Sequence, residues 1–336
     1  MKKTKKILSL IFIICFCLTI VGCSSTSSED EVQRYAWPLG TASPEDTVTQ
    51  IFAEKFADEV NRLSQGKMKI EVYANSVLGG DRELLESCKD GDIPFVVQNT
   101  APQVTFMPQI AVFDMPSVFS SIEEARNAVD NKEFYSLIQG VYEKSGYKLL
   151  GYADQGFRVM STNKKVETLK DFKGQKIRTM ENSNHIAFWK ALGSNPTPMT
   201  FSEVYIGLQQ GTIDAQENPY EVIVSSKIYE QQDYVVETNH LPHLISLIVS
   251  DEFYNKLSRE KQSIIDEAAG TAKIYAREAS DKRIAEKVEA IKASGTKILK
   301  IDEKLQEEIN NSAETVYEII RKQAGDKIVD AYLSKN

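Results

Sequence analysis

The segments GFR (156–158), KIR (176–178), NPTPMTF (195–201) and QENP (216–219) decide how this sequence is interpreted. Stretches with helical periodicity lie between them, so the region predicts alternating strands and helices. Each arginine guanidinium is a planar, permanently charged fork that can hold a carboxylate through two parallel hydrogen bonds. Asn218 precedes a proline, so its backbone favours an extended or turn conformation and leaves its side-chain amide free to point elsewhere. The region therefore predicts an α/β fold with a carboxylate-binding cleft.

Strand and helix also alternate at the start of the chain. Tyr35–Gly40 is predicted as one strand and Met68–Val72, whose apolar residues alternate, as the next. Between them, Ser43-Pro44-Glu45-Asp46 predicts a helix start with a cap residue, a proline in the first turn and an acid after it. Apolar residues at helical spacing then continue to Leu63. This order of strand, helix and strand is typical of an α/β lobe.

The predicted strand 93–99 ends in two amides, Gln98 and Asn99. Ligands in open α/β sheets bind beyond the carboxyl ends of strands, so both amides are candidate ligand contacts. A purely structural role in capping the strand end is the alternative.

A helical pattern of about 35 highly charged residues runs from Ser258 to Ala293, which is too long for an ordinary globular helix. It contains no sustained heptad repeat, so a coiled coil is disfavoured. A chain of 336 residues is also too long for one small core and favours two lobes. We therefore expect a helix that bridges two lobes.

The N-terminus resembles a bacterial lipoprotein signal. Four lysines precede a mostly apolar run of about 15 residues, 7–21, which is short for a membrane span but right for a signal sequence. The run ends in Ile20-Val21-Gly22-Cys23, a lipobox-like motif that predicts cleavage before Cys23 and lipidation of its thiol. Residues 1–22 are thus the expected signal peptide and residues 23–33 a flexible tether.

Cysteine content and charge restrict the function. After cleavage and lipidation, Cys88 is the only free thiol expected, which excludes an intrachain disulfide and predicts a buried packing residue. The formal net charge is -8; without the four signal lysines, 36 basic residues face 48 acidic ones. This acidic balance argues against nucleic-acid binding. An anionic ligand must then be captured by a few placed cations, such as Arg158 and Arg178.

The order and spacing of these segments resemble the extracytoplasmic solute-binding proteins of tripartite ATP-independent periplasmic (TRAP) transporters. The segments that carry the resemblance are LGGDR (78–82), GFR, KIR, NPTPM (195–199), FSEVY (201–205) and QENP. The resemblance covers nearly all of the mature chain. It implies a two-lobed periplasmic-binding-protein architecture with hinge strands, in which the chain crosses between lobes near residues 155 and 243 and along the long helix. Lobe I would comprise residues 34–155 and 244–283, and lobe II residues 156–243 and 284–336.

The resemblance also implies roles for individual residues. Arg178 matches the arginine that pairs with the ligand carboxylate, Arg158 a second cationic contact, and Asn218 an amide donor to the same group. Phe201 matches an aromatic wall of the site. Asp81 and Asn99 match first-lobe positions that reach ligand hydroxyls; members that bind sialic acid commonly carry an acid where Asn99 stands.

The resemblance further implies an organic-acid ligand, a TRAP permease as membrane partner, an extracytoplasmic location and no cofactor. We expect a monomer anchored to the membrane through Cys23 that is not an enzyme. Two other function classes remain open: an extracytoplasmic sugar-acid enzyme built on Glu217 and His240, and the ligand-sensing subunit of a receptor. Metal binding by His240 and His243 is disfavoured because Pro242 lies between them and no third ligand is evident.

The residues favour a particular ligand class. Both matched arginines lie in the second lobe and would serve one carboxylate. The facing groups, Asp81, Gln98 and Asn99 with Gln155 near the crossing, suit hydroxyl groups. A buried Asp81 would repel a second carboxylate. We therefore predict a sugar acid, a hexuronate such as glucuronate or galacturonate, with a C4-dicarboxylate as the alternative.

Overall fold

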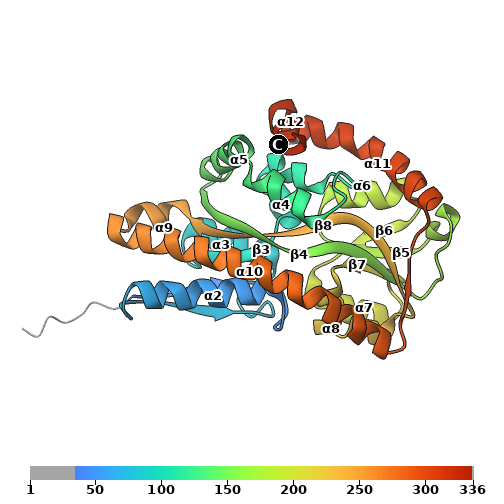
Figure 1. Cartoon of the computed structure of the whole chain (residues 1–336), viewed down its shortest axis with the longest axis horizontal. Helices are drawn as coiled ribbons and strands as arrows, with labels where there is room; N and C mark the ends of the chain where they lie inside the picture. Colours follow the sequence, from blue (N-terminus) through green and yellow to red (C-terminus); the bar gives the residue numbers. More distant parts are fainter. Residues whose placement is uncertain (1–34, 335–336) are drawn as a thin grey trace, which may run out of the picture. The chain divides into compact units, whose positions relative to one another are not determined.

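The structure is a computed structural model, and it describes residues 35–334. The predicted signal peptide, the tether and Cys23 lie outside these residues. Within them, the strands form one nine-stranded mixed sheet with helices packed around it (Figure 1). The strands are β1 (Tyr35–Gly40), β2 (Met68–Tyr73), β3 (Phe95–Asn99), β4 (Tyr147–Thr162), β5 (Lys176–Thr179), β6 (Asn195–Pro198), β7 (Ala215–Asn218), β8 (Tyr234–Ser250) and β9 (Lys297–Leu299).

Most helices have local start signals, and several have a side-chain cap such as Thr47, whose hydroxyl accepts a hydrogen bond from Gln50 N. The α-helices of the first half are α2 (Val48–Leu63), α3 (Asp81–Asp90), α4 (Ile122–Asp130) and α5 (Lys132–Lys144). Those of the second half are α6 (Ser183–Ala191), α7 (Val204–Gln209), α8 (Tyr220–Ser225), α9 (Asp251–Lys256), α10 (Arg259–Ala293), α11 (Glu303–Ala324) and α12 (Asp326–Leu333).

The sheet order, β2-β1-β3-β8-β4-β7-β5-β6, shows two similar halves. On one side β1 pairs in parallel with β2 and β3, and on the other β5 pairs in parallel with β6 and β7. The long antiparallel strands β4 and β8 join the halves. Each parallel set is built from strand-helix units, which explains why both stretches of the sequence show the same alternation.

Helix α10 spans both halves of the fold, as expected from its length (Figure 1). Its first part packs on α2 and β4, and its later part packs on α8 and β9. Two separate apolar cores accompany it: one contains Phe52, Phe56 and Ile265, and the other contains Ile223 and Ile291. The bridging-helix prediction is therefore confirmed.

Three sequence-based boundaries differ from the structure. Helix α2 begins at Val48 with Thr47 as its cap, not at Ser43–Asp46, because Asp46 adopts a left-handed backbone with φ 55°. The apolar runs 148–153 and 244–250 each predict a short strand, but they are parts of the longer strands β4 and β8. Their middles carry polar residues and register shifts, which hide the strand period. Helix α12 was not anticipated.

Composition predicts that Cys88 is a buried packing residue, and the structure agrees. Cys88 is fully buried in α3, and burial raises the pKa of its thiol, as expected of a packing residue.

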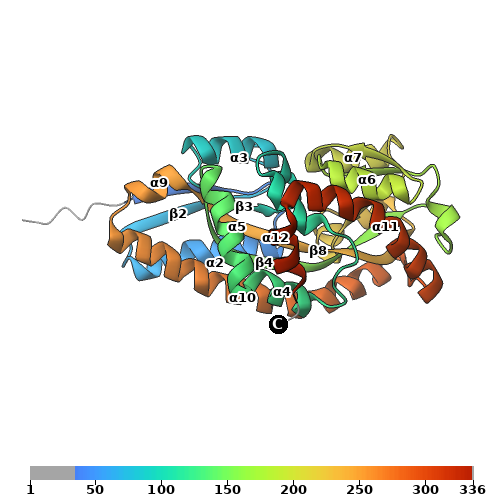
Figure 2. The same ribbon diagram turned by 90° about the horizontal axis from the view of Figure 1, so that it is seen from above.

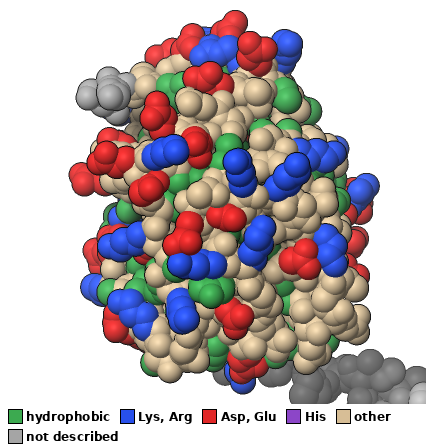
Figure 3. All heavy atoms as spheres, turned by 90° about the vertical axis from the view of Figure 1, so that its right-hand side faces the viewer, with side chains coloured by type: hydrophobic (Ala, Val, Ile, Leu, Met, Phe, Trp, Pro, Cys, Tyr) green, Lys and Arg blue, Asp and Glu red, His purple; other side chains and the backbone are tan. Residues whose placement is uncertain are grey.

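Acidic and basic side chains are interspersed on the face seen in Figure 3, which shows the end of the molecule that carries β5 and β6. Among residues 35–334, no helix combines the length and hydrophobicity needed to cross a bilayer.

Candidate functional site

An inner pocket of about 40 Å³ lies where the parallel strands of both halves end. Its lining residues are Ala42, Ser43, Pro44, Asp81, Asn99, Arg178, Met180, Phe201, Asn218, Val222 and His243. Asn99 and Asn218 are the last residues of β3 and β7, and Ala42 follows β1. In open α/β sheets, ligands bind in the crevice beyond the carboxyl ends of the strands, and the inner pocket lies at such a place.

Arg178 is buried, with 2 % of its surface exposed, yet its guanidinium has no acidic partner within hydrogen-bonding distance among the described residues. Its Nε and Nη2 donate to the carbonyl oxygen of Met199 at 3.1 and 2.8 Å. The Phe201 ring lies 5.8 Å from the guanidinium carbon. Burial lowers the pKa of Arg178 to about 10, so it remains charged at neutral pH. A buried cation without a carboxylate partner favours binding of an anion.

Arg158 and Glu217 form a buried ion pair behind the inner pocket. Arg158 Nε contacts Glu217 Oε2, and Arg158 Nη2 donates to Glu217 Oε1 at 2.8 Å and to its carbonyl oxygen at 2.5 Å. Arg158 also donates to Asn218 Oδ1 at 3.2 Å and contacts His243 Nδ1. Arg158 does not line the inner pocket. It holds residues that do, and its predicted direct contact with the ligand stays a prediction.

Two further histidines surround Glu217. His240 Nε2 lies 3.1 Å from Glu217 Oε2, and His185 lies 3.8 Å from Oε1 and 3.2 Å from Asp114 Oδ1. Burial alone would raise the pKa of Glu217, but Arg158 and these histidines hold it well below its usual value. Burial likewise opposes protonation of His185, yet Asp114 and Glu217 raise its pKa to about 9. Glu217 is therefore a charged structural centre.

The predicted first-lobe contacts divide into two groups. Asp81 and Asn99 line the inner pocket. Asp81 begins α3, and burial raises the pKa of its carboxyl to about 6, although Arg178 opposes the shift. The Asn99 amide already donates to Leu244 O at 2.9 Å and accepts from Ala101 N at 2.9 Å.

The other group, Gln98 and Gln155, does not line the inner pocket. Gln98 is fully buried, and its amide makes no hydrogen bond within residues 35–334. Gln155 donates to Glu221 Oε2 at 3.1 Å. Direct ligand contact by these two residues stays a prediction.

An outer cavity of about 620 Å³ shares Asp81, Arg178, Met180 and Phe201 with the inner pocket and forms its entrance. It lies between α3 and the loop from β6 to α7; in Figure 2, α3 lies to the left of α7. The two sides approach closely, since a methyl group at Gly80 would lie 3.3 Å from Thr200 Oγ1.

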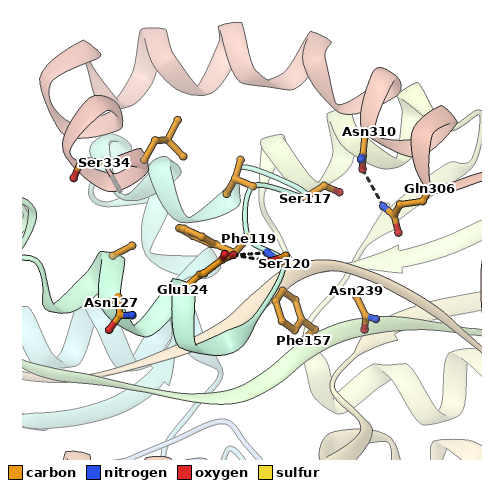
Figure 4. Close-up of a pocket in the computed structure, with 13 residues that line it drawn as sticks. Ser117, Phe119, Ser120, Glu124, Asn127, Phe157, Asn239, Gln306, Asn310 and Ser334 are labelled. Atoms are coloured by element: carbon orange, nitrogen blue, oxygen red, sulfur yellow. Dashed lines mark hydrogen bonds between the residues drawn. The ribbon is translucent and has the colours of Figure 1, made fainter. Parts of the chain in front are cut away.

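A separate cavity of about 740 Å³ lies among α4, α11, the 117–120 loop and the long strands β4 and β8 (Figure 4). Its polar groups are amides and hydroxyls, including Asn127, Asn239, Gln306 and Asn310, together with Glu124. No lysine, arginine or histidine lines it within the described residues. Although larger, it lacks the cation that a carboxylate requires, so the inner pocket is the candidate site.

The comparison with known proteins agrees with this geometry. Residues 39–323 match the family described as bacterial extracellular solute-binding protein, family 7. The chain belongs to this family. A solute-binding protein of Verminephrobacter eiseniae is 35 % identical to this family 7 protein over 248 residues, which cover 73 % of each chain.

Two solved structures share the fold of this family 7 protein. The sugar acid binding protein DctPAm of Advenella mimigardefordensis, in complex with galactonate, has a TM-score of 0.86 and 28 % identity, covering 90 % of this chain and 97 % of its own. A TRAP periplasmic solute binding protein of Sulfurospirillum deleyianum, with bound succinate, has a TM-score of 0.85 and 27 % identity, covering 90 % and 100 %. The expected TRAP solute-binding family and two-lobed α/β fold are thereby confirmed, while the lobe boundaries stay a prediction.

Sequence reasoning missed several residues of this family 7 site. Met180, Val222 and His243 line the inner pocket, as do residues 42–44 after β1. The position of Ala42, just beyond a strand end, was a usable signal. The sequence suggests only a disfavoured metal-binding role for His243, and no group of three side chains that could hold a metal ion occurs within residues 35–334.

Proposed function

We propose that this protein captures a sugar acid, with a hexuronate such as glucuronate or galacturonate as the leading class, and delivers it to a TRAP-type permease. The ligand carboxylate pairs with Arg178, and two lobes close around the sugar. Lipidation of Cys23 would hold the protein at the outer face of the membrane, and the mass of the mature N-terminus tests this.

The observation that supports the proposal is the asymmetry of charge in the inner pocket. Within the part of the chain that the structure describes, Arg178 is the only lysine or arginine that lines it. From the other half of the fold come Asp81 and the amide of Asn99. One buried cation suits one carboxylate, and a facing acceptor suits hydroxyl donors.

A C4-dicarboxylate is the second candidate, favoured by the similar S. deleyianum protein with bound succinate. It would bring a second carboxylate into a pocket where Asp81 is the facing ionisable group. Two carboxylates in one desolvated site repel each other unless one takes up a proton. This repulsion is the reason for preferring a sugar acid. The similar A. mimigardefordensis protein, which is in complex with galactonate, also favours this ligand class.

A calorimetric titration separates the two ligand classes. Purified protein is titrated with glucuronate, galacturonate, gluconate, malate and succinate, and we expect binding of the sugar acids only. Tight succinate or malate binding without a response to the sugar acids would overturn the ligand class and leave the transport function intact.

Asp81→Asn sharpens this titration. Loss of the anionic acceptor should weaken sugar-acid binding roughly 10-fold or more and should improve binding of succinate. Glu83→Gln is the matched control, because Glu83 lies on the same turn of α3 but does not line the inner pocket. An Asp81→Asn protein with unchanged ligand preference would remove Asp81 from the specificity argument.

Contacts between the two halves motivate a prediction about closure. Asp46, just before α2, is bonded to Arg283 at 2.5 Å and to Lys287 at 2.7 Å on α10. Its carbonyl oxygen accepts from Ser225 Oγ at 2.8 Å, and Glu221 Oε2 accepts from Val48 N at 2.8 Å. Ligand contacts from both lobes are complete only in the closed state, so ligand should shift the population towards it.

Small-angle scattering should therefore show a smaller radius of gyration on ligand binding. Asp46→Asn should enlarge the unliganded radius and weaken binding about two- to fivefold, a modest effect because Asp46 is largely exposed. Glu252→Gln, which removes an exposed pair with Lys256 inside one helix, is the control. A radius that is the same with and without saturating ligand would contradict closure.

The enzymatic alternative is disfavoured by the environment of its proposed residues. Glu217 is paired with Arg158, and His240 Nε2 is directed at Glu217 while its Nδ1 lies 2.9 Å from Thr238 Oγ1. Neither side chain lines the inner pocket. A general acid or base must reach the bound ligand, so these residues favour a role in shaping the site over one in catalysis.

A further inference from the structure

His243 lies on the crossing strand β8 and lines the inner pocket, with only 4 % of its surface exposed. Its two ring nitrogens have different surroundings. Nδ1 contacts Nη1 of Arg158. For Nε2, no hydrogen-bond partner occurs within residues 35–334, although the ring forms part of the pocket wall.

The chemistry of Arg158 determines which nitrogen of His243 carries the proton. A guanidinium has five N–H donors and no acceptor, and it stays protonated in proteins. The atom that faces it must therefore offer a lone pair, so Nδ1 is unprotonated. A neutral imidazole with a bare Nδ1 has its hydrogen on Nε2.

The same guanidinium also orients Asn218. Arg158 Nη2 donates to Asn218 Oδ1 at 3.2 Å, while Nη1 contacts His243. One N–H of the Asn218 amide is directed at Gln216 Oε1, 2.6 Å away, which leaves the other for a ligand. Asn218 and His243 are thus fixed side by side on one wall of the pocket, each with a neutral N–H donor.

We propose that His243 is a specificity-determining residue, whose neutral imidazole donates a hydrogen bond from Nε2 to an oxygen at the acid end of the ligand. The inference rests on the proposed binding function and assigns a donor to that site. Arg158 acts through His243 and Asn218 as a positioning residue. The wall then accepts a carboxylate or hydroxyl oxygen and rejects a ligand that presents an N–H or ammonium group there.

The electrostatic surroundings keep His243 neutral. Burial and the charge of Arg158 hold the pKa of His243 well below its usual value, while Glu217 on β7 opposes this shift and His185 on α6 adds to it. Arg178 and Asp81 are the charged groups that share the pocket lining with it. Because burial raises the pKa of Asp81 to about 6, the pH dependence of binding cannot report on His243 alone. The nitrogen signals of the His243 ring are needed.

Two substitutions separate the functions of the two nitrogens. In His243→Asn, the amide oxygen can take the place of Nδ1 and accept from Arg158, but no donor reaches the position of Nε2. In His243→Gln, the longer amide can place an N–H donor there. We expect His243→Asn to melt close to the wild type and to bind the best sugar acid roughly 10- to 100-fold more weakly, and His243→Gln to recover most of the affinity.

Nitrogen-15 NMR of the histidine side chains provides the second measurement. His243 should keep an unprotonated Nδ1 and a protonated Nε2 from about pH 5.5 to 8, and the Nε2 signal should shift when ligand is added. A protonated Nδ1 in this range would overturn the proposal. So would His243→Asn binding within twofold of the wild type, or equal losses in the Asn and Gln variants.

These outcomes are distinct from failure of the proposed function. If the wild type binds no organic acid, the transport function fails. If it binds one while His243→Asn binds equally well, only the role of His243 fails.

Discussion

Replacement of Arg178 by alanine is expected to weaken binding of the cognate organic acid by two to four decades, on the order of 3–5 kcal/mol. Arg178 is buried and, among residues 35–334, is the only lysine or arginine that lines the inner pocket, so its loss leaves the desolvated ligand carboxylate without a charged partner. Arg178→Lys should recover little. A lysine cannot make the double contact with Met199 O and also present a planar fork to the ligand.

Isothermal titration of the two variants checks this expectation. Arg82→Ala is a matched control, because Arg82 lies at the rim of the outer cavity, is exposed, and pairs with Glu86. It removes the same charge without touching the inner pocket, and its binding should stay within threefold of the wild type. Arg178→Ala within that same threefold would exclude Arg178 from the site.

The second large effect is expected from the buried pair of Arg158 and Glu217. Glu217→Leu leaves the Arg158 charge unpaired in a dry interior and should destabilise the fold by about 3–5 kcal/mol. Arg158→Met should cost a similar amount, because Glu217 then loses its main partner. The double variant, Arg158→Met with Glu217→Leu, should regain most of the stability, since it buries no unpaired charge.

Chemical denaturation of the three variants measures what the pair contributes to stability. Titration with the organic acid that binds the wild type measures what the pair contributes to ligand binding. The double variant should fold, but it should bind the ligand more weakly than the wild type, because Asn218 and His243 have lost the guanidinium that orients them. Three equally stable proteins would contradict the structural role. Wild-type affinity in the double variant would contradict the positioning role.

The same cluster gives the fold a defined pH dependence. Glu217 has a depressed pKa, so its contribution is present above its ordinary value of 4.5 and is lost as the pH falls below it. His185 has a pKa raised to about 9, so its contribution is complete below its ordinary value of 6.5 and is lost as the pH rises through 9. Stability from this cluster should be greatest between those two ordinary values, and Glu217→Leu should flatten the acid side.

Among the candidate site residues, the sequence was informative where a local motif fixes the backbone. Asn218 before proline ends β7, Arg178 lies on β5, and Phe201 follows the proline-rich β6. Each lies at or near the carboxyl end of a parallel strand, and strand ends can be recognised from apolar runs bounded by turn residues. Those three residues line the inner pocket together with Asp81 and Asn99.

The different roles of Arg158 and Arg178 could not be predicted from local motifs. Arg158 and Arg178 have similar local sequences, yet Glu217 forms an ion pair with the first, and no acidic side chain among residues 35–334 lies within hydrogen-bonding distance of the second. The difference arises because β4 pairs with β7 in a register that places Met160 opposite Glu217, two residues from Arg158. Pairing register depends on the whole sheet and is not encoded in either segment alone.

The sequence by itself determined the α/β class, the long bridging helix and the carboxylate-binding residue types, because periodicity, turn residues and charge act locally. Only the tertiary structure decided which of these side chains share a pocket. His243 is 65 residues from Arg178 in the chain, and Asp81 is 97 residues away, yet all three line one cavity. Contacts over such distances are set by the crossing of β4 and β8 and by the packing of the two halves, which no local pattern specifies.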